Sequence, residues 1–172
     1  MRWMWIDRVV ELVPGERLVA IKNVSLAEEH LHDHFEATAH RPAMPMMPAS
    51  LILEGMAQTA GLLVGHAGKF AQNVVLAKVG SAEWSREVTP GQTLRYTATM
   101  TKYDSTGAST LGTVEVKDSG SASAFEKIGE IEIMFSHAGQ AMDVKGLGQT
   151  IPKHNFVFGE AFATLLRTSG IS

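Results

Sequence analysis

The feature that most constrains the fold of this chain is a long apolar segment, Met46 to Gly65, with an acid at its centre. The segment is long enough to span a membrane. However, Glu54 and Gln58 occupy its middle and Pro48 lies near its start, and an acid at a bilayer centre costs about 2.5 to 3.5 kcal/mol on insertion scales. We therefore predict a helix buried in a protein core, from Ser50, its expected N-cap, to about Gly65.

The rest of the chain supplies the strands that a buried helix needs around it. The Pro14-Gly15 turn separates two apolar-rich runs and predicts a β-hairpin. Turn-forming residues separate four further strand-like stretches after the helix: Asn73 to Ser85, Thr93 to Tyr103, Ala108 to Lys117 and Ala124 to Ser136. An apolar helix of this kind is stabilised by a curved antiparallel sheet that wraps it, so the pattern predicts an α+β fold.

Length and composition limit the class of protein. A chain of 172 residues with 45% apolar and 19% charged residues is typical of one globular domain. The formal charge of -3 is small and the basic residues are scattered, so we expect neither a nucleic-acid nor a membrane partner. There is no cysteine, which excludes disulfides and thiolate chemistry. The charged N-terminus does not resemble a signal peptide, so we expect a cytoplasmic protein.

The C-terminal part of the sequence differs from the rest. Residues 139–149 are polar and glycine-rich, which is typical of a linker, and residues 159–167 have the pattern of a short amphipathic helix. We therefore predict a main domain over residues 1–137 and a C-terminal appendage over residues 138–172.

The predicted helix carries a single stripe of polar and very small residues. Ser50, Glu54 and Gln58 share one face at four-residue spacing, and Gly61 and Gly65 continue it. Glycines on such a face allow another backbone or a ligand to approach closely. A carboxyl group that is desolvated there is suited to act as a general acid. The alternative is that Glu54 pairs with an arginine or is only half-buried.

Four of the seven histidines lie close together before the helix, at His30, His32, His34 and His40. The first three alternate, so on a strand they would share a face, which is compatible with a metal site. The acidic residues around them favour a solvated loop instead, and we predict no metal and no cofactor. A third reading is that one of these histidines acts as a base opposite Glu54.

Three motifs resemble a known family: KNVSLAEEHLHDHF (Lys22 to Phe35), PMMPAS (Pro45 to Ser50) and LILEGMAQTAG (Leu51 to Gly61). Together they are similar to the β-hydroxyacyl-acyl-carrier-protein dehydratases of fatty-acid synthesis. The resemblance implies a hotdog fold and a lyase that dehydrates a 3-hydroxyacyl thioester of acyl carrier protein or coenzyme A. It also implies a homodimer or a trimer of dimers, because in this family the two catalytic groups come from different subunits.

The resemblance assigns the family's catalytic acid to Glu54 and its following glutamine to Gln58. The family histidine falls on His34 when counted forward from KNVS, and on His40 when counted backward from Glu54, six residues away. We prefer His34, because the upstream match continues without a gap through Phe35. The proline that usually follows is replaced by Glu36, and the loop before the helix is longer than in the family.

The resemblance also implies a mechanism. His34 would abstract the proton next to the thioester carbonyl, and the backbone N–H of Ala49 would stabilise the resulting oxygen anion. Glu54 would protonate the leaving hydroxyl, Gln58 would orient it, and the backbone around Met46 would hold the histidine ring. Phe35, Met46 and Met47 are expected substrate contacts, although methionines here can equally fill gaps in the core.

Two alternatives to a dehydratase follow from the same residues. A thioesterase would use the same acyl slot and an acid to activate water. A module that binds acyl chains or a carrier protein without turnover would result if the longer loop has lost the catalytic geometry.

Overall fold

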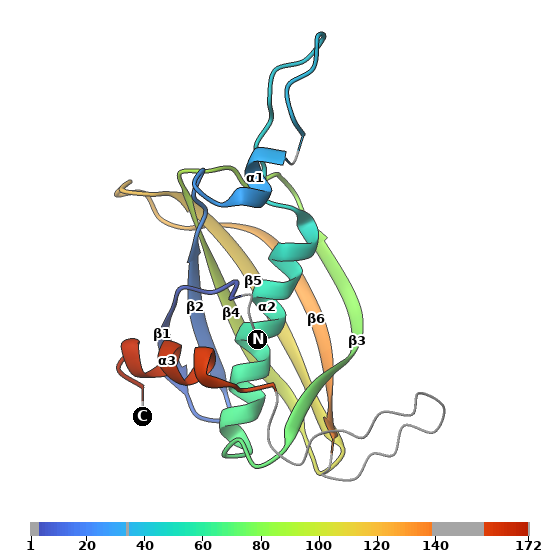
Figure 1. The fold of residues 1–172 in the computed structure, drawn as a ribbon. Helices are drawn as coiled ribbons and strands as arrows, with labels where there is room; N and C mark the ends of the chain where they lie inside the picture. The colour runs from blue at the N-terminus through green and yellow to red at the C-terminus, as the bar shows by residue number, and fades with distance from the viewer. Residues whose placement is uncertain (1–3, 34, 139–156, 172) are drawn as a thin grey trace.

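The computed structural model describes residues 4–33, 35–138 and 157–171, and Figure 1 shows their arrangement. In this part of the chain six antiparallel strands form one sheet in the order β1-β2-β4-β5-β6-β3, and a long helix lies against it. The elements are β1 (Arg8–Val13), β2 (Arg17–Asn23), α1 (Glu29–Asp33), α2 (Ala49–Ala67), β3 (Asn73–Trp84), β4 (Gln92–Tyr103), β5 (Gly107–Asp118), β6 (Glu126–Ala138) and α3 (Glu160–Thr168). The predicted α+β architecture is confirmed.

The predicted hairpin forms, but its first strand begins later than expected. Gly15 has a φ of 71° at the turn, and Val13 pairs with Arg17. β1 starts at Arg8 and not at Trp5, because the backbone N–H of Trp5 donates to a side chain of α2, Gln58, and not to a neighbouring strand. The residues before β1 therefore cross over the helix.

Helix α2 begins one residue earlier than predicted. Pro48 is its N-cap, and its carbonyl accepts hydrogen bonds from the N–H groups of Leu51 and Ile52 at 2.9 and 3.2 Å. The predicted cap at Ser50 is wrong, because Ser50 lies inside the first turn and no side chain caps the helix. A proline suits this place, because its fixed φ matches the helical start and it has no backbone N–H that would need an acceptor.

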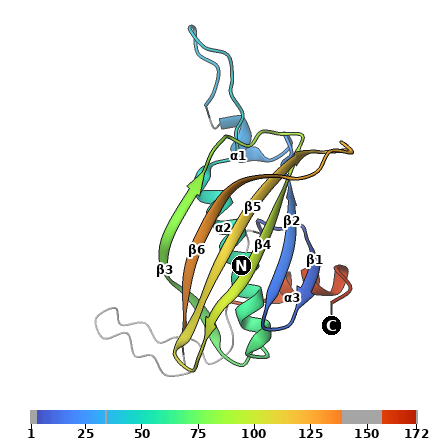
Figure 2. The ribbon, with the colours of Figure 1, turned by 180° about the vertical axis from the view of Figure 1, so that it is seen from behind.

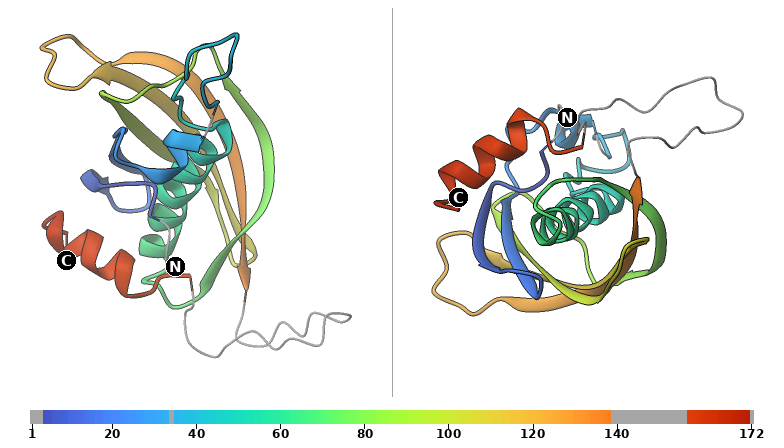
Figure 3. Two further views of the ribbon diagram at one scale, coloured as in Figure 1. Left: turned by 45° about the horizontal axis from the view of Figure 1, so that its top comes forward. Right: turned by 90° about the horizontal axis from the view of Figure 1, so that it is seen from below.

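The sheet curls around α2, as the view from below in Figure 3 shows. The two are in close contact at Gly55, where a Cβ atom would lie 2.6 Å from Cζ of Tyr96 on β4. Tyr96 is fully buried, and this burial, together with the charge of Asp7, raises the pKa of its hydroxyl well above the ordinary value. Gly55 thus lets the helix and the sheet meet without a gap.

His30 and His32 lie in helix α1 and not on a strand, whereas His34 lies outside the described residues. Residues two apart on a helix point to different sides, so His30 and His32 do not share the face on which the metal alternative depended. Among the described residues no cluster of histidine and acidic side chains suits a metal ion.

Helix α3 lies beside β1, outside the sheet edge (Figure 1). The hydroxyl of Ser169 accepts a hydrogen bond from the N–H of Val9 at 3.0 Å, and Phe162 and Leu165 are buried. Figure 2 shows the convex face of the sheet from β3 at one edge to β1 at the other. The predicted short C-terminal helix is therefore present, whereas the predicted division of the chain near residue 137 stays a prediction. Within the described ranges, no helix has the length and apolar character needed to cross a membrane.

Candidate active site

Glu54 and Gln58 lie on consecutive turns of α2 and are joined by a hydrogen bond. The side-chain amide of Gln58 donates through Nε2 to Oε1 of Glu54 at 2.9 Å. Gln58 is 4% exposed, whereas Glu54 is half-buried. In the part of the chain that the structure describes, no arginine or lysine forms an ion pair with Glu54. The carboxyl group is therefore held by an amide and not by a cation.

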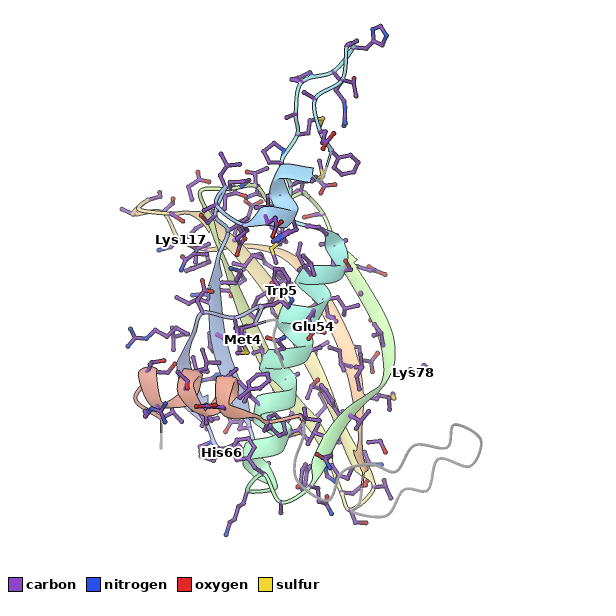
Figure 4. The ribbon with its side chains drawn as sticks, in the orientation of Figure 1. Met4, Trp5, Glu54, His66, Lys78 and Lys117 are labelled. Atoms are coloured by element: carbon purple, nitrogen blue, oxygen red, sulfur yellow. The ribbon has the colours of Figure 1, made fainter. Side chains whose placement is uncertain are left out.

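Trp5 fixes the orientation of the Gln58 amide. The backbone N–H of Trp5 donates to Oε1 of Gln58 at 2.9 Å. Because a backbone N–H can only donate, the amide oxygen must face Trp5, and the amide NH₂ group must then face Glu54. Figure 4 shows Trp5 and Glu54 close together halfway along α2. The amide cannot turn around without losing both of these hydrogen bonds.

The segment that carries Trp5 is itself anchored. The ring of His30 in α1 meets the ring of Trp5 edge-on, with centroids 5.1 Å apart. The residues before α1 are held by Lys22, a nearly buried cation that forms ion pairs with Glu28 and, at 3.5 Å, with Asp7. A buried ion pair of this kind is costly to break from one side. It therefore keeps α1 and the N-terminal segment in place over α2.

A pocket of about 220 Å³ opens beside Glu54. One wall is α2, a second is the start of β3 with Val74, Val75 and Leu76, and the far wall includes Phe158, from the segment before α3. Apart from Glu54 and Gln58, the lining side chains are apolar or absent. An apolar slot with one carboxyl group at its side suits a ligand that joins a hydrocarbon chain to a polar reacting group.

The start of α2 offers unused hydrogen-bond donors. Among the described residues, the backbone N–H groups of Ala49 and Ser50 have no acceptor, and both residues are exposed. These groups lie at the positive end of the helix, where an anion is stabilised. Ala49 lies about 7.5 Å along the axis from Glu54. The predicted oxygen-anion donor is therefore free to act.

The loop between α1 and α2 projects beyond the N-terminal end of α2 (Figure 1). Its two sides are joined by hydrogen bonds from the N–H of Met44 to the carbonyl of Phe35 at 3.0 Å, and from Thr38 to Arg41 at 2.8 Å. The Arg41 guanidinium lies 5.4 Å from the centre of the Phe35 ring. His40 is exposed in the turn at the tip. The loop is thus a narrow arm held by contacts within itself.

The structure describes only one of the two candidate bases. His34, the preferred one, lies outside the described residues. His40 is described, and it is not among the residues that line the pocket beside Glu54. Phe35, which follows His34, has a φ of 58° and a 44% exposed side chain. The choice of base therefore stays a prediction.

The methionines divide into core and surface. Met47 is 1% exposed, and its backbone N–H donates to the carbonyl of Val88 at 2.8 Å, which ties the loop end to the body. Met56, a residue of α2, is fully buried and packs against Gly112 of β5. Met46 is half-buried and Met44 is exposed. Burial therefore favours a core-filling role for Met47, and neither Met46 nor Met47 lines the pocket beside Glu54.

Sequence reasoning missed two parts of this site. Trp5 acts through its backbone N–H, a group that every residue except proline carries, so no side-chain pattern marks it. Phe158 lies beyond the predicted linker, far from the motif region in the chain. An aromatic pair separated from the main domain, Phe158 and Phe162, was the available signal that the tail packs on the body.

Comparison with known families agrees with this geometry. Residues 2–121 match the FabA-like domain, which is more than half of the chain and includes the projecting loop and the whole of α2. The chain belongs to the FabA-like family. The match ends within the turn between β5 and β6, so the segment before α3 that lines the pocket lies outside it.

Two proteins with similar sequences are named 3-hydroxyacyl-acyl-carrier-protein dehydratase FabZ. The protein from Magnetococcus marinus is 39% identical over 103 residues, which are 58% of this chain and 63% of the relative. The protein from Symbiobacterium thermophilum is 41% identical over 99 residues, 57% of this chain and 66% of the relative. The chain thus spans slightly less than two thirds of these relatives. The resemblance to this dehydratase family is confirmed.

Solved structures show the same fold at low sequence identity. The dehydratase heterocomplex ApeI:P from Xenorhabdus doucetiae superimposes with a TM-score of 0.57 at 15% identity, over 80% of this chain and 84% of that one. An acyl-CoA hydrolase from Staphylococcus aureus in complex with coenzyme A gives 0.55 at 13% identity, over 80% and 69% of the two chains. The predicted hotdog fold is confirmed.

Proposed function

We propose that this protein removes water from a 3-hydroxyacyl thioester to give the trans-2-enoyl thioester in fatty-acid-type biosynthesis, in the cytoplasm. The substrate would be carried by acyl carrier protein or coenzyme A. The observation that carries the proposal is Glu54, held by Gln58 at the side of an apolar pocket. An apolar slot accepts the acyl chain, and the carboxyl group can protonate a leaving hydroxyl. The names of the relatives support the same reaction class.

The proposed reaction moves one proton onto the enzyme and one off it. His34 takes a proton from the carbon next to the thioester carbonyl, and the N–H of Ala49 stabilises the negative charge that builds on the carbonyl oxygen. Glu54 gives its proton to the 3-hydroxyl, which leaves as water while the double bond forms. Gln58 orients Glu54, and the backbone around Met46 holds the histidine ring.

The functional unit in this proposal is a homodimer, alone or in a trimer of dimers. Strand β3 is a 12-residue edge strand, and its Val75 and Leu76 side chains are 38% and 44% exposed. An exposed apolar edge strand is a template for pairing with another chain. Since β3 also lines the pocket, pairing along it would bring a second subunit, and its projecting loop, next to Glu54.

The experiment that tests the function is a turnover assay with 3-hydroxybutanoyl thioesters of acyl carrier protein and of coenzyme A. Enoyl formation is followed by absorbance and free thiol is titrated in parallel. Glu54→Gln, which keeps the shape but removes the proton donor, is expected to lower kcat by about 10² to 10⁴. The matched control Glu16→Gln, in the exposed β1–β2 turn, should leave kcat unchanged.

The same assay distinguishes the alternatives. Thiol release without enoyl formation would identify a thioesterase and contradict the proposal. No turnover, combined with a melting temperature that rises with acyl thioester, would identify a binding module.

A further inference from the structure

The end of the pocket farthest from the start of α2 is formed by the C-terminal tail. Val157 and Phe158, just before α3, and Phe162 within it, line the pocket together with Gly61 of α2. These residues lie outside the stretch that matches the FabA-like domain. The closed end of the slot is therefore formed by residues beyond the matched stretch.

Phe158 fills the space above Gly65, one turn beyond Gly61. A Cβ atom at Gly65 would lie only 2.6 Å from Cζ of Phe158, so the ring rests directly on the helix backbone. Its ring centre is 5.0 Å from that of Phe70 and 5.7 Å from that of Phe162, both in edge-on geometry. Phe162 is 2% exposed. The Phe158 ring is thus fixed between two aromatic neighbours.

The same helix face is open one turn earlier. At Gly61 a Cβ atom would meet nothing closer than Cε1 of Phe135, at 3.7 Å, and Gly61 lines the pocket together with Glu54. The slot therefore runs along α2 from Glu54 past Gly61 and ends where Phe158 covers Gly65. Its volume of about 220 Å³ is below the range of about 300 to 1,000 Å³ that is typical of pockets for larger ligands.

We propose that Phe158 sets the acyl-chain length of the substrate, by closing the slot so that the enzyme prefers short 3-hydroxyacyl thioesters. This inference rests on the proposed function of Glu54. The physical basis is steric: a longer chain would have to displace an aromatic ring that is packed on backbone, which a close-packed site resists. Removing the ring would extend the slot over Gly65 and bury further methylene groups of the substrate.

The test compares kcat/KM for 3-hydroxybutanoyl, 3-hydroxyoctanoyl and 3-hydroxydodecanoyl thioesters in the wild type, Phe158→Ala and Phe158→Leu. The wild type should prefer the shortest substrate. Phe158→Ala should raise the ratio of octanoyl to butanoyl kcat/KM at least about tenfold, mainly through a lower KM, with Phe158→Leu between the two. Phe125→Ala, which removes an equal side chain from the turn before β6, should leave the ratio unchanged.

Different outcomes separate this inference from the proposed function. Short-chain turnover with an unchanged chain-length ratio in both Phe158 variants would overturn the inference and leave the function intact. If the wild type turns over no thioester, the proposed function fails, and chain-length preference is then measured as the rise in melting temperature with saturated acyl thioesters. A shift toward longer chains in Phe158→Ala would support the inference there, and no shift would overturn it. Phe158→Leu, the milder change, keeps the test usable if the alanine variant does not fold.

Discussion

Glu54, the proposed acid, lies on a helix packed into a sheet, whereas His40, one of the two candidate bases, lies on a loop that projects from the body. Glu54 is held by Gln58, and Gln58 by the backbone of Trp5, so the chain of contacts ends in the core. The loop around His40 is joined mainly to itself, and its tip is exposed. Glu54 is thus fixed by tertiary packing, whereas the tip of the loop is held by local contacts.

This difference gives a physical reason for the longer loop that the resemblance predicts. Extra residues in a surface loop cost little free energy, because the entropy of closing a loop grows slowly with its length. An insertion in α2 would instead move Glu54 and Gln58 away from the pocket and from Trp5. The added length that the resemblance predicts for the loop would therefore leave the helix motif in place. A loop that projects from its own subunit is also suited to reach a second one.

The largest expected effect comes from removing the proposed base. We predict that His34→Ala lowers kcat by about 10² to 10⁴, whereas His40→Ala has little effect on kcat and changes stability by less than about 0.5 kcal/mol. Steady-state kinetics and urea unfolding of both variants measure this. Loss of activity in His40→Ala alone would move the base to the tip of the loop and keep the reaction class. Full activity in both would contradict the mechanism.

A smaller effect is expected from the support of the acid. Gln58→Leu removes the amide that orients Glu54 and leaves the buried N–H of Trp5 without its acceptor. We predict a fall in kcat of up to about 100-fold, and a loss of about 1 to 3 kcal/mol in the free energy of unfolding. The KM should change much less than kcat, because Gln58 acts through Glu54.

Trp5 provides the matched pair for this prediction. Trp5→Pro removes the backbone N–H, and Trp5→Ala keeps it, while both remove the ring. Only the proline variant should reproduce the fall in kcat of Gln58→Leu. Equal kcat values in the two Trp5 variants would show that the hydrogen bond does not position the acid.

The smallest expected effect concerns the packing beneath the acid. Gly55→Ala places a methyl group 2.6 Å from the buried Tyr96 ring, and we predict a net loss of about 1 to 3 kcal/mol in the free energy of unfolding. Gly61→Ala is the control, since its methyl group meets nothing closer than 3.7 Å. It should gain up to about 1 kcal/mol from helix propensity. Equal shifts of the urea midpoint in both variants would contradict the close approach at Gly55.

Most of the fold could be predicted from the sequence because periodicity and turn residues act locally. The apolar run with Glu54 at its centre predicted a buried helix, and Pro14-Gly15 predicted a hairpin, since both patterns limit the backbone wherever they occur. The cap at Ser50 was predicted wrongly. Serine is a good N-cap residue. However, Pro48 takes the N-cap position two residues earlier, where the absence of a backbone N–H leaves no donor without an acceptor.

The sequence by itself determined that Glu54 and Gln58 share a helix face, because an α-helix places residues four apart side by side. Only the tertiary structure decided that Trp5 fixes the Gln58 amide and that Phe158 closes the slot over Gly65. Both contacts join segments far apart in the chain. A backbone N–H carries no side-chain signal, and an aromatic residue beyond a linker has no periodic relation to the helix that it covers.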